Sequence, residues 1–217
     1  MRLTLAEWQQ TFKDISGLIV QASAVDGSDS WQPFPIGMCW QYLLHYRKGP
    51  ALQIGNHENL LFCAITATTD RRRRPAGGIC RPRIIQTLAA NGFQNTVLLS
   101  ELYFTSLPSY KFVASPEGNG IDCHRHYEAL LAGCIPIMER NPLTEEKYKG
   151  CPVLWTTDYS EITPSYLEAK YKEMIGQTYD FSGLMLGHYP LTLQRKIKEC
   201  GNYWCQKIPE TRRAWYM

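Results

Sequence analysis

The chain has 217 residues, of which 44% are hydrophobic, 12% aromatic and 20% charged. This composition excludes a disordered chain, which would hold fewer aromatic residues and more net charge, and the length excludes a protein of many domains. The net charge of +3 is too small to indicate a protein that binds nucleic acid over its whole surface. We therefore expect a compact globular protein without a nucleic-acid partner.

The cysteines predict the redox environment of the chain. There are eight of them, no two form a CxxC pair, and most lie inside apolar runs such as LLFCAI and LLAGCIPI. Disulfide frameworks are typical of short secreted chains, so reduced and mostly buried thiols are expected here. No apolar run approaches the ~20 residues of a membrane span, and the first residues, MRLTLAEWQQ, lack the apolar core of a signal peptide. The sequence therefore predicts a soluble cytoplasmic protein.

The first half of the chain predicts a mixture of helices and strands. Apolar residues recur at helical spacing over residues 3–13, and an alternating run over 18–25 indicates a strand. Residues 27–50 hold several prolines and glycines and predict only a short helix at about 40–46. The run LLFCAIT, residues 60–66, is typical of a strand buried on both faces. A helical pattern then covers residues 84–89 and ends at Asn91 and Gly92.

In the second half, strands are predicted at 96–99, 111–115, 134–138 and 152–155. Helices are predicted over 123–132, where Gly133 ends the helix, and after Pro164, where Thr163 is a suitable cap. Strands that alternate with helices indicate parallel pairing, because parallel strands need connections long enough to hold a helix. The predicted class is α/β, with a Rossmann-like, mostly parallel sheet and helices on both faces.

The segment over residues 110–138, YKFVASPEGNGIDCHRHYEALLAGCIPIM, carries the most functional information. It predicts a buried strand that ends at Ser115, a loop with two glycines, and a helix that begins beside that loop. In open α/β sheets, ligands bind beyond the carboxyl ends of the strands, and the free N–H groups of a helix start favour phosphate. A diphosphate would suit this place.

Two side chains on the predicted helix suit the parts of a nucleotide. Arg125 and Glu128 are three residues apart and therefore lie on one helix face. A guanidinium suits a diphosphate, and an ionised carboxylate accepts hydrogen bonds from a ribose diol. A plain surface ion pair between the two residues is the alternative.

The same segment resembles the donor-binding half of GT-B glycosyltransferases, in particular exostosin-like enzymes and, more loosely, fucosyltransferases. The resemblance is dense over residues 109–137, where the strand, the SPEGNG loop, the arginine, the glutamate and GCIPI follow in register. It implies a compact or reduced GT-B enzyme that moves a sugar from a nucleoside diphosphate sugar to a hydroxyl of a glycan or glycoprotein. It also implies that no metal and no further cofactor is required.

Carried over by position, the resemblance implies that Glu128 holds the ribose, Arg125 the phosphates, and Glu117 with the glycine loop the donor sugar. The complete set of donor-binding residues that we predict is Ser115, Glu117, Gly118, Asn119, Gly120, Asp122, His124, Arg125 and Glu128. The predicted organisation is an N-terminal acceptor region over 1–105 and a donor-binding region over 106–217, which can also form one compact domain. A non-catalytic nucleotide-sugar-binding or scaffold protein, and another α/β transferase such as a methyltransferase, are the alternatives.

Several residues outside the helix remain open candidates. Arg71 and Arg74 belong to a basic loop between a strand and a helix and could clamp a diphosphate, or the loop could simply be solvated. As catalytic carboxylates we predict Glu117 and Asp26; the alternative for Asp26 is a simple turn with Gly27. Cysteine and histidine also gather at the start of the helix, but no second ligand pair at suitable spacing accompanies them, so no metal site is predicted.

Overall fold

The computed structural model describes residues 2–7, 36–39, 41–42, 57–71, 74 and 78–195. Most of the predicted helices over 3–13 and 40–46, and the whole predicted strand over 18–25, lie outside these residues.

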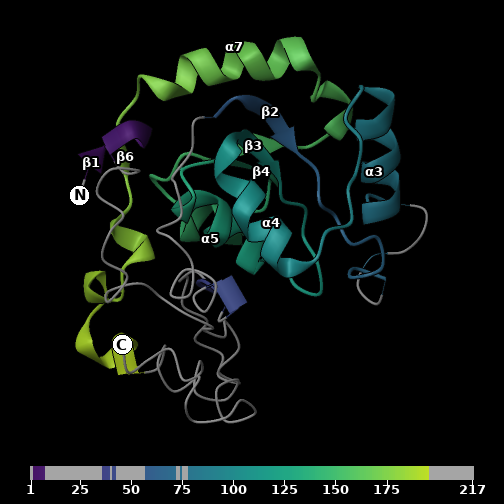
Figure 1. Cartoon of the computed structure of the whole chain (residues 1–217). Helices are drawn as coiled ribbons and strands as arrows, with labels where there is room; N and C mark the ends of the chain where they lie inside the picture. Colours follow the sequence, from purple (N-terminus) through teal and green to yellow (C-terminus); the bar gives the residue numbers. More distant parts are fainter. Residues whose placement is uncertain are drawn as a thin grey trace.

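The centre of the described structure is a parallel sheet of four strands (Figure 1). Its order follows the sequence: β2 (Asn59–Phe62), β3 (Tyr110–Ala114), β4 (Ile135–Glu139) and β5 (Leu154–Thr156). A separate antiparallel pair joins β1 (Arg2–Leu3) to β6 (Tyr179–Asp180). The sheet combines β2, from before residue 105, with three strands from after it. The predicted α/β class with a parallel sheet is confirmed.

Helices fill the connections between the strands. They are α3 (Arg81–Ala90), α4 (Ser100–Ser106), α5 (His124–Leu131), α6 (Pro142–Lys147) and α7 (Pro164–Ile175), with short 3-10 turns at Leu107–Ser109, Tyr159–Glu161, Ser182–Leu184 and Leu186–His188. The predicted cap of α7 is confirmed, because the Thr163 hydroxyl accepts from Tyr166 N at 3.3 Å.

Three local predictions differ from the structure. Helices α4 and α6 were not predicted, although Asn141 and Pro142 form a cap and first position that the sequence could have signalled. The apolar run over 96–99 is not a strand. Thr96 N donates to Cys63 O at 2.8 Å beside β2, but Val97 and Leu99 are 87% and 78% exposed. Apolar content at this edge therefore reflects surface side chains rather than a buried strand.

The register shows that α4 and α7 cover opposite faces of the sheet. Phe62 stacks on Tyr103 of α4, with 5.5 Å between the ring centroids, and Phe112 meets Tyr171 of α7 at 6.0 Å. Phe62 pairs with Val113, the neighbour of Phe112 along β3. Neighbouring residues of a strand point to opposite faces, so the two helices lie on opposite sides. The prediction of helices on both faces is therefore confirmed.

Helix α5 forms the middle of the core. The whole stretch from its third residue to Leu131 is buried, and the helix packs on β4. Gly133, at φ +75°, ends it with two hydrogen bonds, from Gly133 N to Leu130 O and from Cys134 N to Ala129 O. The chain enters β4 directly after this turn, and the predicted end of the helix at Gly133 is confirmed.

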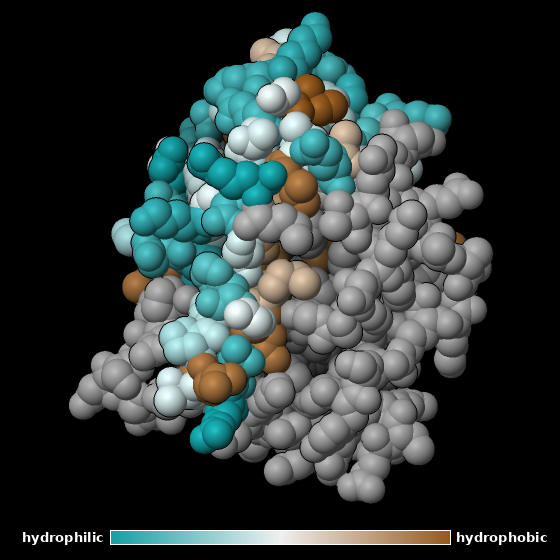
Figure 2. All heavy atoms as spheres, turned by 90° about the vertical axis from the view of Figure 1, so that its left-hand side faces the viewer, coloured by the Kyte–Doolittle hydropathy of each residue, from teal (hydrophilic) through white to brown (hydrophobic). Residues whose placement is uncertain are grey.

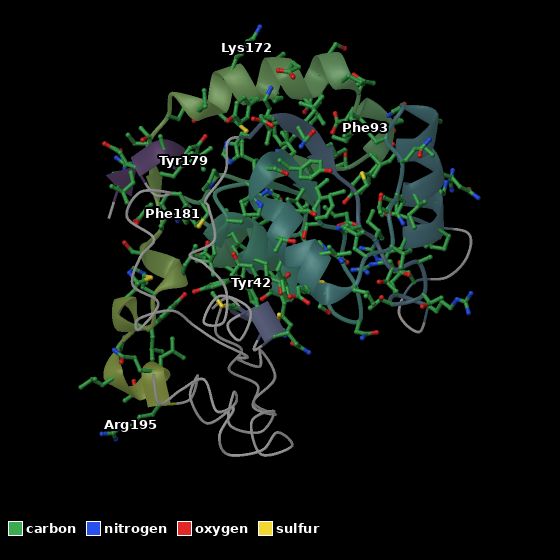
Figure 3. All side chains as sticks on the ribbon, viewed as in Figure 1. Tyr42, Phe93, Lys172, Tyr179, Phe181 and Arg195 are labelled. Carbon is green, nitrogen blue, oxygen red and sulfur yellow. The ribbon has the colours of Figure 1, made fainter. Side chains whose placement is uncertain are left out.

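The outer surface is mostly polar where it is described. Figure 3 shows Lys172 pointing from α7 away from the sheet, whereas Tyr179 and Phe181 lie near the β1–β6 pair. On the face shown in Figure 2, hydrophilic side chains predominate and the apolar ones form small separate groups. Among the described helices, none has the length and apolar character needed to cross a membrane.

The described cysteines form no disulfide with one another. All six of them, Cys39, Cys63, Cys80, Cys123, Cys134 and Cys151, are free thiols, and three are buried. Cys63 follows β2, and Cys123 immediately precedes α5.

A substitution at Gly92 tests how much the end of α3 depends on a residue in the left-handed backbone conformation. Its φ is +91°, and a Cβ placed there would have no atom within 4 Å, so the backbone alone disfavours a side chain. We expect Gly92→Ala to lower the free energy of unfolding by about 1 kcal/mol.

Urea denaturation measures this change, and Gly176→Ala is the matched control. Gly176 caps α7 at φ −85° and also has open space around its Cβ position, so alanine there should be neutral or slightly stabilising. Equal destabilisation by both variants would contradict the conformational explanation.

Candidate functional site

The candidate site lies at the carboxyl edge of the sheet. Parallel strands bring the segments that follow β2 and β3 to the same edge, and α5 begins there as well. The glycine loop, which we define as residues 115–122, connects β3 to this helix. Within it, Gly118 N donates to Gly120 O at 3.0 Å. Ser115, Glu117 and Gly118 are buried, whereas Asn119 is exposed.

Helix α5 begins without a side-chain cap. Cys123 is its N-cap residue and gives the helix no side-chain hydrogen bond. The Nδ1 of His124 donates to Gly37 O at 2.8 Å, which ties the helix start to residues 36–39. An uncapped helix start carries partial positive charge and N–H donors that suit an anion.

Arg125 extends from this helix start to the segment after β2. Its Nη2 donates to Ala64 O at 2.8 Å, and its guanidinium lies 5.7 Å from the centre of the Tyr103 ring. The Nε atom is buried and has no hydrogen-bond partner among the described residues. Arg125 therefore retains donor capacity in a partly buried place.

Glu128 is brought to the same cluster but lies deeper. It is 5% exposed, and its Oε2 accepts from Tyr103 Oη at 3.2 Å. Burial, together with the charge of Glu128, raises the pKa of Tyr103 well above its ordinary value, so the phenol stays protonated and donates. Tyr103 thus stands between the predicted phosphate-binding and ribose-binding residues. The assignment of Glu128 to a ribose stays a prediction.

A pocket of about 200 Å³ opens next to Arg125. It lies between the end of β2, the segment before α4 and the start of α5. Its lining consists of Ala64, Ile65, Thr66, Thr96, Val97, Leu98, Ser100, Tyr103 and Arg125. Hydroxyl groups, one guanidinium and several apolar side chains line this space. Its volume is below the roughly 300 Å³ of typical ligand pockets, so it is too small to enclose a whole nucleotide sugar.

The predicted phosphate-binding arginines occupy different places. Arg71 is exposed. Arg74 instead bridges two carboxylates, to Glu117 Oε2 at 2.5 Å and to Glu139 Oε1 at 2.8 Å, and all three side chains are 9% exposed. Although burial opposes it, the bonds to the two carboxylates raise the pKa of Arg74 above its ordinary value. Arg74 thus connects the glycine loop to the end of β4.

Glu117, predicted as a catalytic carboxylate, is held from several sides. Besides Arg74, Asn141 Nδ2 approaches its Oε1 at 3.4 Å, and its backbone N donates to Glu139 Oε2 at 2.9 Å. The second predicted catalytic carboxylate, Asp26, lies outside the described residues. Both assignments stay predictions.

Asp122 fastens the end of the glycine loop. Its carboxylate accepts from Ile36 N at 2.9 Å, from Lys147 Nζ at 3.1 Å and from Tyr148 Oη at 2.7 Å. The ion pair with Lys147 is almost completely buried, with side chains 5% and 1% exposed. The neighbours of Asp122 in this structure are thus the protein's own donors.

Sequence reasoning missed Arg81, which lies under the glycine loop. This side chain is buried, and its guanidinium donates to Pro116 O at 2.9 Å and to Glu117 O at 2.8 Å. Main-chain carbonyls are present at every position of a sequence, so no residue type signalled this contact. Tyr103 was missed because the helix that carries it was not predicted.

Cysteine and histidine at the start of α5 show no metal-ligand arrangement. His126 is fully buried, with its Nδ1 2.7 Å from Ser115 Oγ and its Nε2 3.4 Å from Ile121 O. Within the described residues, no group of three or more histidine, cysteine, aspartate or glutamate side chains could hold a metal ion.

Comparison of the sequence with models of known protein families and with curated proteins finds no match in either case.

The buried His126 predicts a pH dependence of stability. Burial lowers its pKa to about 4, against an ordinary value of 6.5. Below pH 6.5 the unfolded chain takes up a proton that the folded chain does not, so stability falls as the pH falls toward 4. We expect this residue to reduce the free energy of unfolding by roughly 2 kcal/mol between pH 7 and pH 5.

Urea denaturation at several pH values measures this effect in wild type and in His126→Gln. The comparison uses the slope with pH, because the substitution also changes stability at neutral pH. An unchanged slope in the variant would contradict the assignment of this titration to His126.

Proposed function

We propose that the chain is a glycosyltransferase that transfers a sugar from a nucleoside diphosphate sugar to a hydroxyl group of a glycan or glycoprotein. The observation that carries the proposal is the buried Nε of Arg125, which has no hydrogen-bond partner within the described part of the chain and lies beside a pocket at the carboxyl edge of the sheet. Unpaired buried donors are rare in folded proteins, and an anionic ligand would satisfy this one. The sequence resemblance of residues 109–137 adds the class of ligand.

The chemistry required of the site is electrostatic. In such a transfer the bond between the sugar and the diphosphate breaks, and negative charge develops on the leaving diphosphate. Arg125 and the uncapped start of α5 are positive groups fixed at one place, which is the arrangement that stabilises such charge. Glu128 as the ribose partner, and Glu117 or Asp26 as the catalytic carboxylate, belong to the proposal as predictions.

A thermal-shift screen tests the class of ligand. The panel contains UDP, GDP, CMP, dTDP, S-adenosylhomocysteine and NAD, each with Mn²⁺ or with EDTA. A ligand at about 100 times its dissociation constant adds about 2.7 kcal/mol, which is a shift of several degrees for a chain of this size. We expect a shift with one nucleoside diphosphate that EDTA does not remove.

Other outcomes of the screen point elsewhere. A shift with S-adenosylhomocysteine alone would favour a methyltransferase. Nucleotide binding without transfer or hydrolysis of the nucleotide sugar would favour a non-catalytic binding protein. Silence from every nucleoside diphosphate would contradict the proposal.

Arg125→Gln provides the matching test at the level of a residue. Loss of the guanidinium removes a charge-assisted donor, so we expect the affinity for the nucleoside diphosphate to fall at least about tenfold. Arg83→Gln is the control, because Arg83 is an exposed arginine of α3 and the substitution removes the same charge. Titration calorimetry measures both, and equal affinities in the two variants would contradict the role of Arg125.

A further inference from the structure

Arg81 joins the two chain segments that form the candidate site. Its backbone N donates to Asp70 Oδ2 at 2.8 Å, which fixes the start of α3. Its guanidinium donates to Thr66 O at 3.2 Å in the segment after β2, and to Pro116 O and Glu117 O in the glycine loop. One side chain therefore fastens two neighbouring strand ends to each other.

The way in which Arg81 is bound is unusual for a buried cation. It is 4% exposed, and its three guanidinium acceptors among the described residues are all main-chain carbonyls rather than carboxylates. Burial, and then the charge of Arg125, lower its pKa from the ordinary value. Burying a charge in this way is costly, and a planar fork of donors is what allows one residue to meet three carbonyls. Lysine has one nitrogen and cannot reproduce this pattern.

The glycine loop is adapted to Arg81 at one residue. A Cβ added to Gly118 would lie 2.9 Å from Nη2 of Arg81, and 3.4 Å from both Cys123 Sγ and Thr69 Cγ2. A side chain at this position would therefore displace the guanidinium from its present contacts with the loop backbone. Arg81 and Gly118 form one packed unit directly beside the start of α5.

We propose that Arg81 is a positioning residue that holds the glycine loop in the conformation that binds the diphosphate. This inference rests on the proposed function. Arg81 acts through the loop backbone, and it contacts no ligand itself. Its role is to keep the loop from moving away from the start of α5, so that no binding energy is spent on ordering it.

Hydrogen exchange tests the inference without a ligand. In Arg81→Lys, two of the three carbonyl bonds are lost, and we expect the backbone amides of residues 117–121 in the loop to exchange at least about tenfold faster. The amides of α7 should keep their wild-type rates. Arg83→Lys, which makes the same exchange of side chains at an exposed position of α3, should change neither region.

Binding provides the second readout. The probes are inorganic pyrophosphate and the nucleoside diphosphate that the thermal-shift screen selects. We expect both Arg81→Lys and Gly118→Ala to weaken these probes about tenfold. In the double variant, the loss of affinity should be smaller than the product of the two single losses. The reason is that lysine lacks the Nη2 atom that the new Cβ would meet.

The outcomes separate the inference from the proposed function. If wild type binds none of the probes, the proposed function fails, and hydrogen exchange alone decides the role of Arg81. Wild-type exchange of the loop in Arg81→Lys would overturn the inference, whatever the binding results. Faster exchange throughout the chain, α7 included, would also overturn it, since Arg81 would then support the whole fold. If Arg81→Lys does not fold, faster loop exchange in Gly118→Ala supports the inference and unchanged exchange refutes it.

Discussion

Buried guanidinium groups hold together the segments that follow the strands of the sheet. Arg74 joins the glycine loop to the end of β4 through two carboxylates, and Arg81 joins the same loop to the segment after β2 through carbonyls. Arg125 adds a third contact, from the start of α5 to Ala64. The loops at this edge depend on these cations, because parallel strands end side by side but do not themselves order the segments that leave them. Arg81 and Arg125 thus bring two guanidinium groups to this edge, whereas the charge of Arg74 is balanced by Glu117 and Glu139.

Much of the fold could be predicted because its signals are local. The buried run of β3, the helical pattern of α5 and the stop at Gly133 each depend on residues within one element, and the structure contains all three. The prediction failed where the apolar composition of a segment does not match its exposure to solvent. Residues 96–99 have the composition of a buried strand, but Val97 and Leu99 lie exposed at the edge of the sheet, where no further strand covers them among the described residues.

The candidate site could be predicted only in part. The sequence indicated the glycine loop and Arg125, because the spacing of glycines and the start of a helix can be recognised from neighbouring residues in the sequence. It did not indicate Arg81, whose acceptors are carbonyls of any residue, or the position of Tyr103 between Arg125 and Glu128. For Arg74 the sequence showed the charge but not its partners, because the two carboxylates that it bonds are 43 and 65 residues away in the chain. Long-range pairing decides whether a basic side chain faces solvent, a ligand or the protein.

The free cysteines on either side of the candidate site have a chemical consequence. Burial raises the pKa of Cys63 to about 12 and that of Cys123 to about 11. The thiolate is the nucleophile that attacks an alkylating reagent, so at neutral pH these two side chains react very slowly in the folded protein. Alkylation at Cys63 and Cys123 therefore reports the opening of the strand end and of the helix start directly. The protein carries its own chemical probes at both sides of the loop, without any introduced label.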